Sequence, residues 1–187
     1  MLVHIEESLK LDTVFINAYW WSIDALSHHY GPYSSAVINE IKILDLFLKE
    51  LIKIIDKDTL LIITADHGQI ESTPNAIIDL SKMEAAKNIL LPITDVRAPY
   101  LYTNGRFDKR ELENFGDLII MEKDEAFKMG LFGEEEKFKE RVGDFIILIK
   151  DDSTISYISD PSEVSLVGKH GNLTEEEMCV PLMIYYR

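Results

Sequence analysis

The amino-acid sequence predicts an α/β fold in which a mostly parallel sheet is flanked by helices. Apolar runs of strand length alternate with segments whose apolar residues recur at helical spacing, and this alternation is typical of the α/β class. The chain has 187 residues, of which 47% are hydrophobic, and this is enough for one compact domain with its own core. Because no repeat or linker-like segment interrupts it, residues 1–187 are predicted to form a single α/β domain.

The first third of the chain predicts a strand–helix–strand unit. Residues 12–18 form an apolar, strand-like run. Residues 34–55 carry apolar side chains at helical spacing, and Ser34 or Ser35 is expected to cap this helix. Residues 59–65 form a second strand after a short link. Two strands joined by a helix are expected to be parallel neighbours with a right-handed crossover.

Later elements follow the same alternation. Helices are predicted over residues 75–90, 109–115 and 123–129, and strands over residues 117–121, 144–150 and 179–186. The last run is strongly apolar and is expected to be a core strand. It contains Cys179, for which a buried structural thiol is the expected environment. Because Cys179 is the only cysteine, an internal disulfide is excluded.

The charge of the chain excludes several kinds of partner. A formal net charge of −14 disfavours binding to nucleic acid or to an anionic membrane, since both need a basic surface. No segment has the length of a membrane span, and the acidic first ten residues are not a signal peptide, so a cytoplasmic location is expected unless the chain is a fragment. An anionic substrate would require local cations, and bound metal ions are the obvious candidates.

Asp and His side chains follow two of the predicted strands. Asp24 and His28 are four residues apart, which places both on one face of a helical turn. Asp66 and His67 follow the second strand, where Gly68 allows the chain to turn sharply. The alternatives are a helix cap for Asp24, a solvated His28 and a turn cap for Asp66. If the two strands are parallel neighbours, both pairs emerge at the same edge of the sheet, where α/β folds bind ligands.

A third segment, His170-Gly171, offers the same chemistry, although a histidine before glycine is often only a turn residue. Together the three segments supply carboxylate and imidazole donors, which suit Zn²⁺ or Mn²⁺. Cysteine is absent from all three, so a structural zinc site is disfavoured and an open catalytic site is favoured. His29 is interpreted as a residue at the surface or one that supports a metal ligand, and His4 as a solvated residue.

The set formed by Asp24, His28, Thr64-Ala65-Asp66-His67-Gly68 and His170-Gly171 resembles the alkaline phosphatase superfamily, and within it the type I phosphodiesterase/nucleotide pyrophosphatase family. The resemblance covers nearly the whole chain and is sharpest over residues 13–37, 59–70 and 143–184. It implies an alkaline phosphatase-like core in which Asp24, His28 and His170 hold one divalent ion while Asp66 and His67 help to hold a second. Two such ions, expected to be zinc with manganese as the alternative, would clamp a phosphoryl group of a small phosphate ester or nucleotide.

The sequence departs from the family pattern in one respect. Family members have an amino-terminal half that supplies a further Asp ligand and a Thr or Ser nucleophile, and no matching segment is present here. Thr64, Ser72 and Thr73 lie near the second motif but match no nucleophile position. The chain is therefore predicted to be the carboxyl-terminal portion of a metal-dependent hydrolase of phosphodiester or pyrophosphate bonds, with weak or absent activity alone and no catalytic residue of its own.

Other functions stay open at this point. The chain is also consistent with a noncatalytic metal-binding module that associates with the missing half or with itself. Sister enzymes such as phosphoglycerate mutase and phosphonoacetate hydrolase use comparable Asp and His clusters. Lys169 and Arg97 are the basic residues considered for contact with a substrate phosphate, and a solvated structural role is favoured for both.

Overall fold

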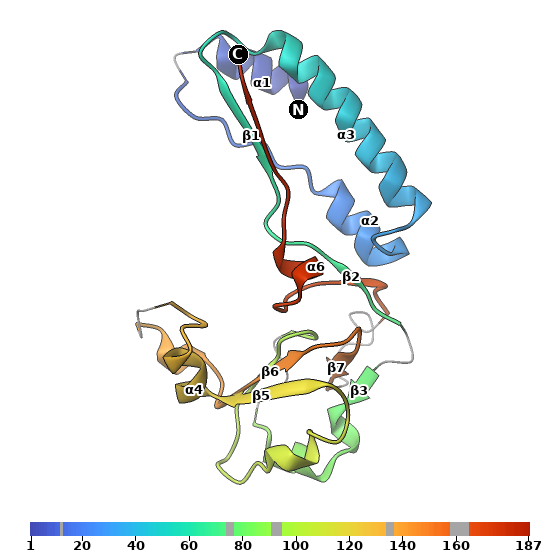
Figure 1. Ribbon diagram of the computed structural model, residues 1–187, viewed down its shortest axis with the longest axis vertical. Coiled ribbons are helices and arrows are strands. Elements are labelled where there is room, and N and C mark those ends of the chain that lie inside the picture. The colour runs from blue at the N-terminus through green and yellow to red at the C-terminus, as the bar shows by residue number, and fades with distance from the viewer. Residues whose placement is uncertain (12, 74–76, 91–94, 134–136, 158–164) are drawn as a thin grey trace.

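Two groups of secondary-structure elements lie along the long axis of the molecule, and short connecting elements lie between them (Figure 1). The structure is a computed structural model and describes residues 1–11, 13–73, 77–90, 95–133, 137–157 and 165–187. The first group contains both chain termini, and the second contains the middle of the chain. The mixture of helices and small sheets confirms the predicted α/β class.

The first group consists of three helices and a two-stranded sheet. Its elements are α1 (Leu2–Leu9), α2 (Ser22–Tyr30), α3 (Ser35–Ile54), β1 (Leu60–Thr64) and β9 (Leu182–Tyr186). A buried cluster of Ile5, Leu51 and Ile55 joins α1 to the carboxyl-terminal end of α3, and Leu61 of β1 packs against this cluster. The predicted helix over residues 34–55 and the predicted strand over residues 59–65 are therefore confirmed, within one residue at each end.

The amino terminus of α3 provides a test of local helix stability. The Ser34 hydroxyl accepts a hydrogen bond from the Val37 N–H, which satisfies one of the free donors of the first turn. We expect Ser34→Ala to lower the free energy of unfolding by about 1 kcal/mol, as loss of an N-cap does. Ser35→Ala, one residue inside the helix, is the matched control and should change it by less. Urea unfolding of the two variants checks this, and an equal loss in both would contradict the assignment of Ser34 as the cap.

The expected parallel strand pair at the start of the chain is not formed. β1 pairs with β9, and the pairing is antiparallel, with Ile62 opposite Ile184. Residues 13–18 form no strand, and Val14 and Phe15 are exposed. An extended segment becomes a strand only when a neighbour supplies hydrogen bonds, and residues 13–18 have no such neighbour here. Residue 12 lies outside the described part of the chain.

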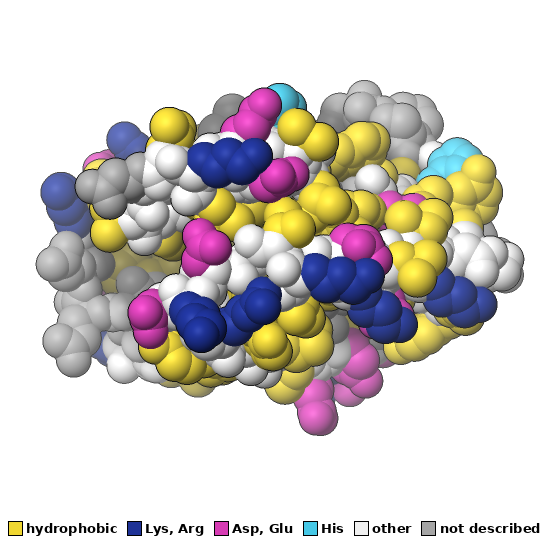
Figure 2. Space-filling view, turned by 90° about the horizontal axis from the view of Figure 1, so that it is seen from above, with side chains coloured by type: hydrophobic (Ala, Val, Ile, Leu, Met, Phe, Trp, Pro, Cys, Tyr) yellow, Lys and Arg dark blue, Asp and Glu magenta, His cyan; other side chains and the backbone are white. Residues whose placement is uncertain are grey.

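The carboxyl-terminal run forms the predicted strand but not the predicted core. All five residues of β9 are exposed, and β9 and β1 form a two-stranded sheet with no third strand among the described residues. Figure 2, which views the molecule from above, shows hydrophobic side chains reaching the surface between charged ones. Cys179 is also exposed, at the end of the short helix before β9, so the prediction of a buried thiol is wrong.

The second group is built on small sheets, and α4 (Lys123–Lys128) is the α-helix among its described residues. Its elements are β3 (Ile77–Asp79), β4 (Tyr100–Leu101), β5 (Leu118–Glu122), α4 (Lys123–Lys128), β6 (Phe145–Ile149) and β7 (Thr154–Ser156), with the 3-10 helices η1 (Leu80–Lys82), η2 (Glu84–Asn88), η3 (Lys109–Glu111) and η4 (Lys139–Arg141). β6 lies between β4 and β5 and is antiparallel to both, whereas β3 and β7 are parallel. Among the described strands, β3–β7 is the one parallel pair, so the sheet is less parallel than predicted. The strands predicted over residues 117–121 and 144–150 and the helix predicted over residues 123–129 are confirmed.

Two predicted helices in this group are wrong. In place of a helix over residues 75–90, the described residues 77–90 form β3, η1 and η2. The Asp79 carboxylate accepts hydrogen bonds from both the N–H and the hydroxyl of Ser81, which favours a tight turn over a continuing helix. Met83 is extended between the two 3-10 helices. In place of a helix over residues 109–115, the single turn η3 forms after the cap Asp108.

The connecting elements bring distant segments of the chain together. They are β2 (Ile70–Glu71), β8 (Gly168–Lys169) and the short helix α6 (Glu175–Met178). β2 and β8 pair antiparallel, with Ile70 opposite Lys169. This pairing places the residues before β2 beside the residues after β8, near the carboxyl-terminal half of α2. Among the helices that the structure describes, none combines the length and the apolar character needed to cross a membrane.

Candidate metal centre

Helix α2 presents Asp24 and His28 one turn apart on the same face. The His28 Nε2 atom lies 3.3 Å from the Asp24 Oδ1 atom. The helix begins after Trp21, so Asp24 is not its cap. The other imidazole nitrogen of His28, Nδ1, lies 2.8 Å from the Gly168 carbonyl oxygen and donates a hydrogen bond to it. This bond leaves the lone pair on Nε2, directed toward Asp24, which is the arrangement of a metal-ligating histidine.

His170 joins this pair from the end of β8. Its Nε2 atom lies 4.0 Å from the Asp24 Oδ1 atom, and its ring centroid lies 5.1 Å from that of His28. The donor atoms of Asp24, His28 and His170 all lie within 4.8 Å of one another. Gly171 follows at φ +118°, and a Cβ atom there would lie 2.8 Å from the Asp95 carboxylate. Both the backbone conformation and the close approach therefore require glycine after His170.

Asp66 and His67 lie beside this group rather than inside it. The His67 ring stacks on the His170 ring, with 3.5 Å between centroids and an interplanar angle of 16°. The His67 Nε2 atom lies 3.8 Å from the Asp66 carboxylate, and the Asp66 side chain is 65% exposed. The five residues singled out in the sequence thus meet at one place in the fold, three in a tight group and two at its exposed rim. His29 is exposed and meets the Tyr30 ring edge-on, as expected of a surface residue.

Gln69 is a member of the site that the sequence reasoning missed. Its side-chain N–H donates a hydrogen bond to the Asp24 Oδ1 atom, and its Oε1 atom is buried without a hydrogen-bond partner among the described residues. The bond orients the Asp24 carboxylate toward the histidines. The only signal in the sequence was the position of Gln69 directly after Gly68, between the motif and β2. Gly168, which holds His28, was likewise missed because only its backbone carbonyl takes part.

The two basic residues considered for phosphate contact are buried, so the prediction that they are solvated is wrong. Arg97 is fully buried in an ion pair with Glu177. Lys169 is buried in β8, with its Nζ atom 3.5 Å from the Thr154 hydroxyl.

Electrostatics favour the neutral form of His170. Burial lowers the pKa of His170, and the neighbouring His67 and His28 lower it further, while Asp24 and Asp95 act in the opposite direction. A neutral imidazole is the form that binds a metal ion. The environment of His170 therefore favours the ligand form of the side chain at neutral pH.

The donor set fits a divalent ion of the zinc type. Two ligands that are each about 2 Å from a zinc ion lie at most about 4 Å apart. The separations of 3.3 Å and 4.0 Å between Asp24 and the two histidines lie within this limit, whereas the group as a whole is bounded at 4.8 Å, so the two histidines would approach each other by up to about 1 Å on binding an ion. Three protein donors would leave a fourth position for a substrate oxygen, as in catalytic zinc sites. The three side chains are partly exposed, so a ligand can reach them.

Comparison with proteins of known structure places this arrangement in context. Murine ectonucleotide pyrophosphatase/phosphodiesterase 5 superposes with a TM-score of 0.80 at 21% identity, covering 100% of this chain and 51% of that one. The human protein gives a TM-score of 0.79 at 22% identity, covering 99% of this chain and 51% of that one. Phosphonoacetate hydrolase from Sinorhizobium meliloti gives 0.62 at 19% identity, covering 86% and 43%. These likenesses show a shared fold, and the chain spans about half the length of each phosphodiesterase structure.

Sequence comparison leads to the same group of proteins. GPI ethanolamine phosphate transferase 1 from Neurospora crassa is 33% identical over 69 residues, which cover 34% of this chain and 7% of that protein. The family model of type I phosphodiesterase/nucleotide pyrophosphatase matches residues 5–173, a range that includes all five candidate ligands. The chain therefore belongs to the type I phosphodiesterase/nucleotide pyrophosphatase family.

Proposed function

We propose that this chain supplies part of the metal centre of a hydrolase that cleaves phosphodiester or pyrophosphate bonds in small, nucleotide-like substrates. The convergence of Asp24, His28 and His170 within 4.8 Å is the observation that carries the proposal. These three residues would hold one divalent ion, of zinc or manganese, and Asp66 and His67 would contribute to a second. A bound cation would neutralise charge on a phosphoryl oxygen, which the net charge of −14 otherwise repels.

The chain's own residues prepare the site in two ways. Gly168 and Gln69 fix the tautomer of His28 and the orientation of the Asp24 carboxylate. The stacking of His67 on His170 supports a role for Asp66 and His67 as further donors beside the group of three. A nucleotide substrate is supported by the murine relative, an inactive variant of which has been solved in complex with AMP. Phosphonoacetate, bound in the structure of the hydrolase relative, is the alternative kind of substrate.

The proposal assigns the nucleophile to a segment outside these 187 residues. Within the described residues, the side chains of the three candidate ligands hydrogen-bond to Gln69 and Gly168 and make ring contacts with His67 and with each other, and none of these partners carries a hydroxyl. The relatives of known structure are about twice as long as this chain. Residues 1–187 would then be one α/β domain that carries a portion of a larger catalytic fold.

A metal-binding interaction module is the second candidate, and the exposed apolar surface favours it. Val14, Phe15 and all of β9 are exposed, and such a surface is typical of a site that another polypeptide covers. The partner would be the remainder of the family fold or a second copy of this chain. Light scattering after size-exclusion chromatography distinguishes the two partners, because only self-association gives the mass of a dimer for the purified chain. The two functions can coexist if the partner brings the nucleophile.

Metal titration and an esterase assay test the main proposal. Titration of the metal-free chain with Zn²⁺ in competition with a chromogenic chelator should show one ion bound tightly and a second bound weakly. The loaded chain should hydrolyse bis(p-nitrophenyl) phosphate at or near the rate of free Zn²⁺, because positioned residues that act as one unit lose most of their effect when one is missing. Failure to bind zinc would contradict the metal centre. Rapid turnover that His170→Ala abolishes would contradict the assignment of the nucleophile to another segment.

A further inference from the structure

Glu177 connects the two histidine segments that stack on each other. Its backbone carbonyl oxygen accepts a hydrogen bond of 2.7 Å from the N–H of Gly68, the residue after His67. Its side-chain Oε1 atom accepts a hydrogen bond of 3.1 Å from the N–H of Asn172, two residues after His170. One buried residue of α6 therefore holds both loops by their main chains.

Glu177 is itself fixed by a buried ion pair. Its side chain is 1% exposed and that of Arg97 is 0% exposed. The Arg97 guanidinium donates to both carboxylate oxygens, through Nε to Oε1 at 3.2 Å and through Nη2 to Oε2 at 2.9 Å. The Thr174 hydroxyl donates to Oε2 at 2.7 Å. Such a two-pronged contact fixes the plane of the carboxylate as well as its position.

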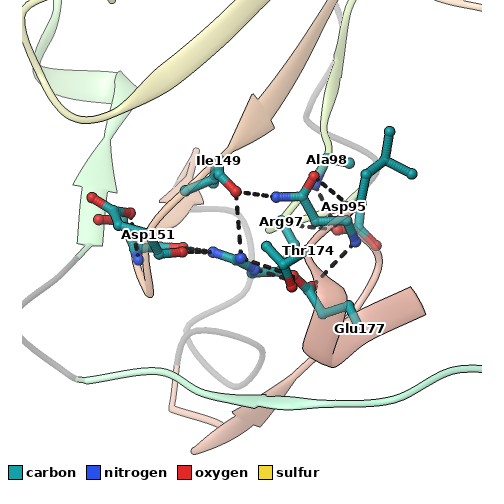
Figure 3. A network of polar contacts seen from close by, with 10 residues as sticks. Asp95, Arg97, Ala98, Ile149, Asp151, Thr174 and Glu177 are labelled. Atoms are coloured by element: carbon teal, nitrogen blue, oxygen red, sulfur yellow. Dashed lines mark hydrogen bonds and ion pairs between the residues drawn. The ribbon is translucent and has the colours of Figure 1, made fainter. Parts of the chain in front are cut away.

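Arg97 is anchored in turn to the second group of elements. Its Nη1 atom donates to the backbone carbonyl oxygens of Asp151 and Ser153, which follow β6 (Figure 3). The Asp95 carboxylate accepts a hydrogen bond from the Arg97 N–H and lies against Gly171, next to His170. Arg97 and Glu177 thus link the two histidine segments to the chain that follows β6.

The two glycines that follow the histidines allow this close packing. A Cβ atom at Gly68 would lie 1.9 Å from the Glu176 carbonyl oxygen, so no other residue fits without displacing α6. A Cβ atom at Gly171 would meet the Asp95 carboxylate at 2.8 Å. Each histidine segment therefore lies directly against part of the Arg97–Glu177 network, with no side chain between them.

We infer that Glu177 and Arg97 are positioning residues that set the stacking of His67 on His170 and hence the place of His170 opposite Asp24. Neither side chain is assigned a contact with substrate or metal. The inference rests on the proposed metal centre for its effect on ion binding, but the geometry of the two rings can be measured without any ion. Loss of the network should let the two histidine loops move independently.

Glu177→Gln is the first test, because it keeps the backbone carbonyl and the shape of the side chain while it removes the charge. In the metal-free chain labelled with ¹⁵N-histidine, the contact between the His67 and His170 rings, seen as a nuclear Overhauser effect, should be lost. Zinc affinity should fall by about 10–100-fold, as it does when groups that orient metal ligands are changed. Ile78→Val is the matched control, because it removes one methyl group from the core at β3 and leaves the network intact. It should keep both the ring contact and the zinc affinity.

Thr174→Val covers the case in which Glu177→Gln does not fold. It removes one hydrogen bond to the Glu177 carboxylate and leaves the ion pair in place, so a weaker effect in the same direction is expected. An unchanged ring contact in a folded Glu177→Gln or Thr174→Val chain would overturn the inference, as would equal losses in Ile78→Val. A wild-type chain that shows the ring contact but binds no zinc would contradict the proposed function and leave the positioning role supported.

Discussion

Replacement of His170 by alanine should remove tight zinc binding from this chain. His170 supplies one of three donor atoms within 4.8 Å of one another, and its ring also supports His67. Loss of a group that only orients a ligand lowers metal affinity by about 10–100-fold, so loss of a ligand itself should cost more. Two remaining donors on α2 resemble the i, i+4 pairs of ordinary helix surfaces, which hold an ion weakly. We expect the affinity to fall by at least about a hundredfold.

His29→Ala is the matched control for this experiment. His29 is next to His28 in the sequence, but its side chain is exposed and its ring contacts Tyr30 instead of the cluster. Chelator competition at pH 7 should give the wild-type affinity for His29→Ala and a large loss for His170→Ala. Circular dichroism should show that both variants are folded, because His170 is only partly buried. Equal affinities for the two variants would remove His170 from the metal centre.

The sequence was sufficient to predict the parts of the fold that depend on local pattern. Helix α3 and strand β1 were predicted within a residue because long periodic runs and the Ser34 cap specify them locally. The strand predicted over residues 12–18, of which 13–18 are described, and the core position of β9 were predicted incorrectly because strand pairing depends on partners far away in the chain. Val14 has the right composition for a strand, but composition does not provide the neighbour that a strand requires.

In the candidate site, too, the sequence predicts what local spacing sets and not what depends on distant parts of the chain. Asp24 and His28 could be paired from their spacing alone, since four residues make one helical turn. His170 could be joined to them only through the resemblance to a family, because β8 brings it from 142 positions away by pairing with β2. Glu177 gave no signal, because it ends a run of three glutamates that is typical of a solvated helix face. Its burial depends on Arg97, 80 positions away.

Arg97→Met should strongly destabilise the chain. It leaves the Glu177 carboxylate buried without its partner, and removal of one member of a buried ion pair costs about 3–5 kcal/mol. The backbone carbonyl oxygens of Asp151 and Ser153 also lose their donor. For a chain of this length, a loss of that size lowers the melting temperature by roughly 10 °C. Arg110→Met breaks the exposed pair with Asp108 and should leave the melting temperature nearly unchanged.

A double variant decides whether Arg97 acts through Glu177. Arg97→Met with Glu177→Gln has no unpaired buried charge, so it should be more stable than Arg97→Met alone, with a coupling of about 1–3 kcal/mol between the two changes. Urea unfolding of the four proteins in this cycle measures the coupling. If the two losses are simply additive, Arg97 stabilises the chain through its contacts with the backbone carbonyls after β6. A strong coupling would instead assign its effect to the carboxylate of Glu177, and through that residue to the two loops that carry His67 and His170.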